Sequence, residues 1–337
     1  MEAINWNEIG FGYIKTDYNV RCYYRNGKWG KIEVSSSEHL PIHIAATSLH
    51  YGQEAFEGLK AFKGKDGKVR LFRWEENAKR LQDSAKGILM AAPPIELFKK
   101  MLKKVIRKNQ RFIPPYGTGA SLYIRPVLFG TGAQVGVKPA DEYVFIIFVT
   151  PVGPYFKEGF KPVSMLITRK YDRAAPLGTG KYKVGGNYAA SLTSMQKAHD
   201  EGYASVLYLD AREKKFIDEC GPANFFGIKN RTYITPKSDS ILPSITNRSL
   251  IALAKDMGLK TERRQVELEE LATFEEAGAC GTAAVISPIG KIVDDDTGTV
   301  YEYKNAPGKI STQLYARLQA IQTGDEEDIF GWVEIVE

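Results

Sequence analysis

The segment 178–192, GTGKYKVGGNYAASL, holds the residues whose types and spacing best suit covalent chemistry. Lys183 stands just before a Gly-Gly pair and a helix-like run, and Tyr188 follows five residues after it. Glycines let a backbone approach a flat or bulky ligand closely. A confined site disfavours the ammonium form of a lysine, and the neutral amine can form a Schiff base with a carbonyl. The segment therefore predicts a nucleophilic lysine, with a surface loop as the alternative.

A second segment, FIDECGPANFFGI at 216–228, places Glu219 at the end of one predicted strand, shortly before the chain enters another. A nearly buried carboxylate needs a cationic partner. A pyridinium nitrogen would serve, and a simple hairpin with an acid at its edge is the alternative interpretation.

A third set of residues could bind an anion. ILPSITNRSL at 241–250 runs through a turn into a helix that starts near Thr246. Helix N-termini present N–H groups and the positive end of the helix dipole, which suits phosphate. A small-residue turn adds the Thr282 hydroxyl, and Arg80 on a predicted helix could supply the compensating positive charge.

Length and composition limit the class of protein. The 337 residues suit two domains of ordinary size, and 43% hydrophobic with 26% charged residues argue against a disordered chain. The net charge of +6 suits small anionic ligands better than a polynucleotide. The lysines of 95–109 have no interleaved aromatic residues, so we expect a solvated helix face and no nucleic-acid partner.

Cysteine and histidine usage gives no sign of a disulfide framework or a metal site. Three cysteines are widely spaced and four histidines form no HExxH pattern, so we expect free thiols in a reducing cytoplasm and no bound metal. The N-terminus has no signal-peptide pattern. The most apolar run, 143–149, is far too short to span a bilayer and predicts a buried strand, so no membrane partner is expected.

The order of the elements indicates an α+β fold rather than a doubly wound sheet. Turn pairs Asn26-Gly27 and Asp66-Gly67 predict two hairpins, within 13–34 and 58–74. Helical periodicity covers 76–90, 95–109 and 187–202, and strand patterns cover 120–128, 143–150 and 204–210. A stretch rich in proline and glycine divides the chain into an N-terminal domain at 1–151, a linker at 152–162 and a C-terminal domain at 163–337.

Together these segments resemble the branched-chain amino-acid aminotransferases, within the fold-type-IV family of pyridoxal-phosphate enzymes. Eight motifs carry the resemblance in order along nearly the whole chain. They are LHYGQEAFEGLKAF (49–62), FRWEENAKRL (72–81), YIRPVLFG (123–130), PVGPYF (151–156), KYKVGGNYA (181–189), ECGPANFF (219–226), LPSITNRSL (242–250) and GTAA (281–284).

The resemblance implies a role for each matching residue. Lys183 would be the Schiff-base lysine and would carry the proton between the substrate and the cofactor. Glu219 would keep the pyridine nitrogen protonated, which makes the ring an electron sink. Tyr188 would hydrogen-bond the phenolic oxygen of the ring. The phosphate would be held by Arg80, the amides of Ile245 and Thr246, and Thr282.

The resemblance also implies the substrate pocket. Aromatic residues that match the family's pocket wall are Phe11, Tyr51, Phe56, Tyr123 and Tyr155. Such a wall suits leucine, isoleucine and valine, whose burial contributes roughly 1.5–3 kcal/mol each. Arg125 matches the arginine that reaches the distal carboxylate of glutamate. The substrate α-carboxylate would bind at the Thr282-Ala283 turn. Val135 and Val137 match a loop that reaches the neighbouring subunit, which implies a homodimer.

The implied function is transfer of amino groups between branched-chain L-amino acids and 2-oxoglutarate with pyridoxal 5′-phosphate. The implied architecture is a smaller N-terminal α/β domain and a larger C-terminal domain with the cofactor between them. Two alternatives stay open: a D-amino-acid aminotransferase or aminodeoxychorismate lyase of the same fold, and a non-catalytic protein that binds the cofactor. The set of Lys183, Glu219 and Tyr188 argues against a mere binder, and Arg125 argues against the first alternative.

Overall fold

The computed structural model describes residues 4–6, 8–153 and 160–336, and the chain divides into two compact units. The first unit comprises Met1–Lys157, Tyr182–Gly185 and Ile321–Glu337, and the second comprises Glu158–Lys181 and Gly186–Ala320. The expected linker at 152–162 spans this change of unit, and its residues 154–159, Tyr155 among them, lie outside the described residues. Nothing in the sequence pattern indicated that 182–185 and 321–337 return to the first unit.

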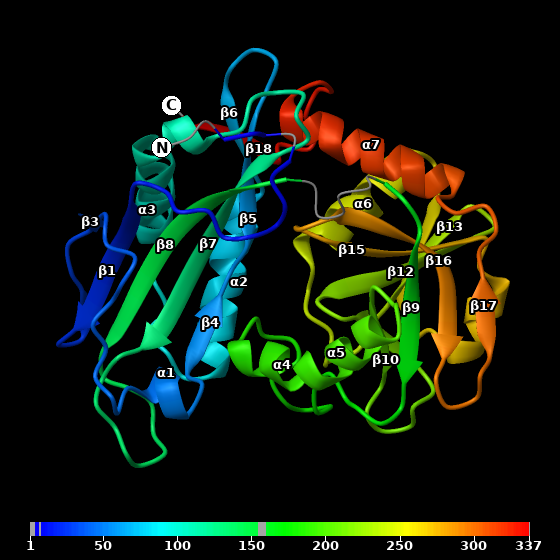
Figure 1. Cartoon of the computed structure of the whole chain (residues 1–337), viewed down its shortest axis with the longest axis horizontal. Helices are drawn as coiled ribbons and strands as arrows, with labels where there is room; N and C mark the ends of the chain where they lie inside the picture. Colours follow the sequence, from blue (N-terminus) through cyan, green and yellow to red (C-terminus); the bar gives the residue numbers. More distant parts are fainter. Residues whose placement is uncertain (1–3, 7, 154–159, 337) are drawn as a thin grey trace. The chain divides into compact units, whose positions relative to one another are not determined.

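The first unit contains an antiparallel sheet of nine strands within the described residues. Its long β7–β8 pair, side by side in Figure 1, forms the centre and carries Tyr123 and Arg125. Its main path runs β18 (Val333–Val336), β6 (Val69–Phe72), β5 (Leu59–Lys63), β7 (Ser121–Gly130), β8 (Tyr143–Val152), β1 (Asn19–Arg25) and β2 (Lys28–Trp29), with β3 (Glu33–Ser35) beside β1 and β4 (Glu54–Phe56) beside β7.

Both hairpins that the sequence predicts are present in this sheet. Tyr24 pairs with Trp29 and Arg25 with Lys28, so a two-residue turn at Asn26-Gly27 joins β1 to β2. Both turn residues have positive φ, of 51° and 75°, which is the conformation that Asn-Gly favours. β5 and β6 form the second hairpin around the predicted turn at Asp66-Gly67.

Two amphipathic helices pack against this sheet and form its core. α2 spans Trp74–Gly87 and contacts β4, while α3 spans Ile95–Lys108 and contacts β1 and β8. The buried face of α3 consists of Phe98, Met101, Leu102, Val105 and Ile106, at helical spacing. The shorter helices of this region are α1 (Thr47–His50) and η1 (Gln110–Phe112). This packing fixes α2, and with it Arg80.

The second unit contains a mixed sheet that closes on itself. β11 pairs with both β10 and β12, so the path β11-β10-β9-β16-β15-β12 forms a ring, and β13 and β14 extend it from β12. The β9 pairings with β10 and β16 are parallel. The strands are β9 (Val163–Thr168), β10 (Ser205–Leu209), β11 (Ile217–Cys220), β12 (Ala223–Lys229), β13 (Thr232–Pro236), β14 (Lys260–Arg264), β15 (Glu276–Gly281), β16 (Val285–Asp294) and β17 (Val300–Glu302).

Helices surround this ring, so both units combine helices with sheets. α5 packs on β9 and β10, and α6 packs on β14 and β15. The helices are α4 (Gly185–Ala190), α5 (Leu192–Asp200), α6 (Ile245–Asp256), η2 (Leu268–Thr273) and α7 (Lys309–Thr323). No helix within the described ranges is long and apolar enough to cross a membrane.

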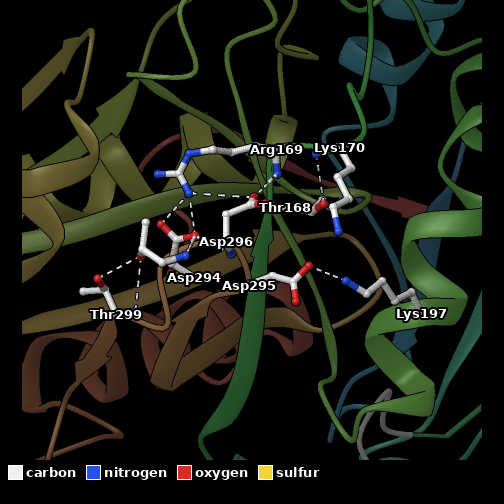
Figure 2. Close-up of polar contacts among 9 residues, drawn as sticks. Thr168, Arg169, Lys170, Lys197, Asp294, Asp295, Asp296 and Thr299 are labelled. Atoms are coloured by element: carbon white, nitrogen blue, oxygen red, sulfur yellow. Dashed lines mark hydrogen bonds and ion pairs between the residues drawn. The ribbon is translucent and has the colours of Figure 1, made fainter.

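An ion-pair cluster joins α5 to the ends of β9 and β16 (Figure 2). The Nη1 atom of Arg169 lies 2.6 Å from a carboxylate oxygen of the buried Asp294, and Lys197 on α5 pairs with Asp295. Burial opposes ionisation of Asp294, but bonds from Arg169 and from backbone amides bring its pKa below the usual value. Two carboxylates of the run Asp294–Asp296 are thus paired with basic side chains, Asp294 with Arg169 and Asp295 with Lys197. No group of side chains suited to a metal occurs in the part of the chain that the structure describes.

Candidate active site

Lys183 is held by its own backbone in the first unit. Its N–H donates to Ser84 Oγ on α2 at 2.8 Å, and its carbonyl accepts from the N–H of Phe56 at 3.1 Å. The Nζ atom lies 4.6 Å from the centre of the Phe56 ring. Burial lowers the pKa of Lys183 to about 8, and the nearby charge of Arg80 acts in the same direction, whereas Glu57 acts in the opposite one. The amine is therefore neutral to a useful degree near pH 8, as a nucleophile requires.

Arg80 forms a buried two-point ion pair with Glu57, a residue that sequence reasoning did not single out. The Arg80 Nε atom donates to Glu57 Oε1 at 2.7 Å, and Nη2 donates to Oε2 at 2.8 Å. The Glu57 side chain is fully buried and that of Arg80 is 10% exposed. Asn77 and the N–H of Gly58 also donate to Oε2. The guanidinium is thus fixed in orientation before any ligand binds.

Four of the expected pocket residues come together in the first unit: Phe56 on β4, Tyr123 and Arg125 on β7, and Phe11 before β1. Arg125 donates from Nη2 to the Tyr123 hydroxyl at 2.9 Å, and its guanidinium lies 4.8 Å from the Phe56 ring centre. Phe11 meets Tyr123 edge to face, with ring centres 5.2 Å apart. Gly58 leaves room for this arrangement, because a Cβ there would lie 2.1 Å from the Tyr123 hydroxyl. The group combines apolar walls with one fixed cation.

Tyr51, Val135 and Val137 form a different group. The Tyr51 hydroxyl donates to the carbonyl of Val135. The side chains of Val135 and Val137 are 81% and 89% exposed, so they do not line a pocket within the described part of their own unit. Large exposed apolar side chains on one loop are typical of an interaction surface.

Glu219 lies on β11 of the second unit and is almost completely buried. Its Oε2 lies 2.7 Å from the Nε atom of Arg173, and Asn224 on β12 donates to its Oε1. Arg173 in turn donates to the carbonyls of Gly180 and Ser240. Asn224 is held by Asn247 of α6, which donates to its Oδ1 at 3.1 Å. The arginine therefore places a positive charge directly beside this buried carboxylate.

Two backbone sites of the second unit could bind anions. Ile245 and Thr246 are the first residues of α6, and the Ser244 side chain caps this helix by accepting from the N–H of Asn247. Thr282 and Ala283 lie in the three-residue turn between β15 and β16, where Gly281 pairs with Val285. Val285 has a φ of +65°, which is strained for a β-branched residue and costs about 1–3 kcal/mol. Tyr188 is half-buried on α4.

Each unit, taken by itself, holds groups that suit one part of a cofactor with a phosphate, an aldehyde and a basic ring nitrogen. In the first unit Arg80 could donate to a phosphate, and Lys183 provides an amine. In the second unit the N-terminus of α6 could donate to a phosphate, and Glu219 provides a buried carboxylate. Sequence reasoning missed Glu57, Asn77 and Arg173, which hold these groups in place. Only the presence of a buried charge on Arg80 and Glu219 could have indicated that such partners exist.

Comparisons with known proteins show which family the chain belongs to. The amino-transferase class IV family pattern matches residues 54–292. The branched-chain-amino-acid aminotransferase of Haemophilus influenzae is 47% identical over all of both chains. The crystal structure of the Escherichia coli branched-chain amino acid aminotransferase is 29% identical with a TM-score of 0.80, and the match covers 96% of this chain and 100% of that one.

A further solved structure bears on the cofactor. It is the T.th. branched-chain amino acid aminotransferase complexed with N-(5′-phosphopyridoxyl)-L-glutamate, which is 25% identical with a TM-score of 0.79. The match covers 96% of this chain and 100% of that one. The predicted α+β, fold-type-IV class is confirmed by these matches.

Proposed function

Because the chain belongs to the class IV aminotransferases and is a pyridoxal 5′-phosphate enzyme, we propose that it transfers amino groups between branched-chain L-amino acids and 2-oxoglutarate. The observation that carries the choice of substrates is the group of Phe56, Tyr123 and Arg125. Their aromatic rings suit aliphatic side chains, and the fixed guanidinium suits the distal carboxylate of glutamate. A single pocket can therefore accept both classes of substrate.

The bound cofactor supplies a pyridine ring that accepts the electron pair left when the substrate Cα–H bond breaks. Residues of the chain would bind the ring and move the proton. Glu219, beside which Arg173 places a positive charge, would pair with the protonated ring nitrogen. Tyr188 would donate to the phenolic oxygen of the ring. Lys183 would take the proton from the substrate Cα atom and return it to the cofactor carbon, a role that its lowered pKa of about 8 suits.

The phosphate would be held by groups of different kinds. Arg80 offers a full charge, already oriented by Glu57. The amides of Ile245 and Thr246, with Thr282, offer hydrogen bonds and the positive end of a helix dipole. The substrate α-carboxylate would bind at the Thr282-Ala283 turn.

We also propose a homodimer in the cytoplasm. The exposed Val135 and Val137 support it, because they could reach the pocket of a second copy. Tyr51 holds the loop by its bond to the Val135 carbonyl. The three cysteines are free thiols, which suits a reducing compartment.

The visible absorbance of the purified protein tests the function. The spectrum is recorded with added pyridoxal 5′-phosphate, and then with L-leucine or D-alanine. We expect a coloured protein that bleaches with L-leucine and not with D-alanine. Bleaching with D-alanine alone would favour a D-amino-acid aminotransferase, and a coloured protein inert to both would favour the lyase or the binder. A protein that takes up no cofactor would contradict the proposal.

A further inference from the structure

Glu57 lies in the short segment that connects two of the cations of the first unit that the proposed function uses, Arg80 and Lys183. It follows β4, and its N–H donates to the carbonyl of Pro126 on β7 at 2.8 Å. Its neighbour Phe56 donates from its N–H to the carbonyl of Lys183 at 3.1 Å, so the backbone of the lysine is tied to the same short segment. The carboxylate itself faces Arg80 and is 0% exposed. One segment thus places both Lys183 and the partner of Arg80.

The contacts of the Glu57 carboxylate leave it no freedom. Its Oε1 accepts from Arg80 Nε, and its Oε2 accepts from Arg80 Nη2, from Asn77 Nδ2 at 2.8 Å and from the N–H of Gly58 at 3.3 Å. Asn77 and Arg80 lie three residues apart on α2, so the helix and the strand connection are joined at this point. The Nε–Nη2 edge of the guanidinium is taken by Glu57 and cannot also hold a phosphate. Glu57 therefore determines which edge Arg80 presents.

The charge of Glu57 also acts on Lys183. Arg80 on α2 and Arg125 on β7 both disfavour the ammonium form of the lysine, whereas Glu57 and Tyr123 favour it, and burial lowers its pKa to about 8. Without the Glu57 carboxylate, the repulsion of the Lys183 ammonium by Arg80 and Arg125 would be less well compensated. The amine would then lose its proton at lower pH.

We propose that Glu57 is a positioning residue that aims Arg80 at the cofactor phosphate and balances the charge of Arg80 beside Lys183. This inference rests on the proposed function only for the identity of the phosphate-bearing ligand. A merely structural role would affect folding and leave both the preference for a phosphate and the titration of Lys183 unchanged.

The test compares two probes that differ only in the phosphate, pyridoxal 5′-phosphate and pyridoxal, on the cofactor-free protein. The absorbance change reports the reaction of the Lys183 amine with the aldehyde, with loss of water. For Glu57→Gln we expect the ratio of the two affinities to fall by about tenfold or more. We also expect the pH midpoint of the reaction with pyridoxal to fall by about one unit. Glu334→Gln is the matched control, because that carboxylate in the same unit is bound by Trp74 and Lys103.

A milder variant keeps the test usable if Glu57→Gln does not fold. Asn77→Ala removes one donor to Glu57 and keeps its charge, so we expect a fall in the ratio of about threefold and an unchanged pH midpoint. A wild-type ratio in both variants would overturn the inference, as would equal losses for both probes. If the wild type reacts with pyridoxal 5′-phosphate but not with L-leucine, the proposed substrates fail and the assignment of Glu57 stands, because neither probe involves a substrate.

Discussion

The first unit holds the pair Arg80–Glu57 and the second unit holds Arg173–Glu219, each with its closest nitrogen and oxygen atoms 2.7 Å apart and both partners buried. Their roles are opposite. In the first pair the arginine is the proposed ligand and the carboxylate orients it, whereas in the second the carboxylate is the ligand and the arginine orients it. A buried ion pair contributes little net stability, because desolvation offsets the attraction. We therefore infer that each pair serves to hold a functional charge in place.

The surroundings of the two pairs differ in a way that matches these roles. Glu57 is fixed by a backbone amide and by Asn77, so its further partners are donors. Arg173 is fixed by the carbonyls of Gly180 and Ser240, so its further partners are acceptors. In both cases the orienting residue is secured by bonds besides the one to the functional charge. We infer that losing an orienting residue should mimic, in weaker form, the loss of its functional partner.

The largest effect is expected from Lys183→Ala, because no orienting residue can replace the amine. Turnover of L-leucine should fall by at least about a thousandfold, and some pyridoxal 5′-phosphate should still bind through Arg80 and the N-terminus of α6. Steady-state rates and equilibrium dialysis with the cofactor measure the two quantities. Turnover at the wild-type rate would remove Lys183 from the mechanism.

The next largest effect concerns the second pair. Arg173→Met leaves Glu219 buried without its cation, so we expect a loss of about 3–5 kcal/mol in the free energy of unfolding. Urea unfolding of the cofactor-free protein measures it. Adding Glu219→Gln to the same chain should recover part of the loss, because the buried charge is then gone. A double variant no more stable than Arg173→Met would show that the arginine acts through its bonds to Gly180 and Ser240 alone.

Arg125→Ala tests a cation outside the two ion pairs. Its guanidinium donates to the hydroxyl of Tyr123. We expect kcat/KM for glutamate to fall about 10- to 100-fold and that for L-leucine to change by less than about threefold, because only glutamate has a distal carboxylate. Tyr123→Phe keeps the ring and removes the acceptor of Arg125, so it should give a smaller loss in the same direction. Equal losses for both amino acids would make Arg125 structural.

Sequence patterns predicted the local parts of this structure and not the pairs. The Asn26-Gly27 turn and the apolar face of 95–109 depend on neighbours in sequence, so they could be read from the chain. Glu57 and Arg80 are 23 residues apart, and Glu219 and Arg173 are 46 apart, so only the tertiary fold brings them together. The same holds for β18, which joins the sheet of the first unit by pairing with β6. Motif resemblance proposes ligand residues because it compares whole chains, and these remain predictions. It assigns no role to the residues that contact them.

Ser244→Ala should give the smallest effect, a modest loss of cofactor affinity. It compares the two groups proposed to hold the phosphate, the N-terminus of α6 and Arg80. The first unit offers this group a full charge on Arg80, whereas the second offers the N-terminus of α6. Losing the cap frees the N–H of Asn247 from its bond and costs about 1 kcal/mol of stability, a fivefold change in an equilibrium constant. We therefore expect cofactor affinity to fall by no more than about fivefold, against a far larger fall for Arg80→Ala. Isothermal titration with pyridoxal 5′-phosphate measures both affinities. Thr312→Ala is the control, because the Thr312 hydroxyl bonds the carbonyl of Gly308 at the start of α7. Equal losses in Ser244→Ala and Arg80→Ala would mean that the helix end, not the arginine, carries the phosphate. The pair Arg80–Glu57 would then hold no functional charge, and the comparison with Arg173–Glu219 would fail.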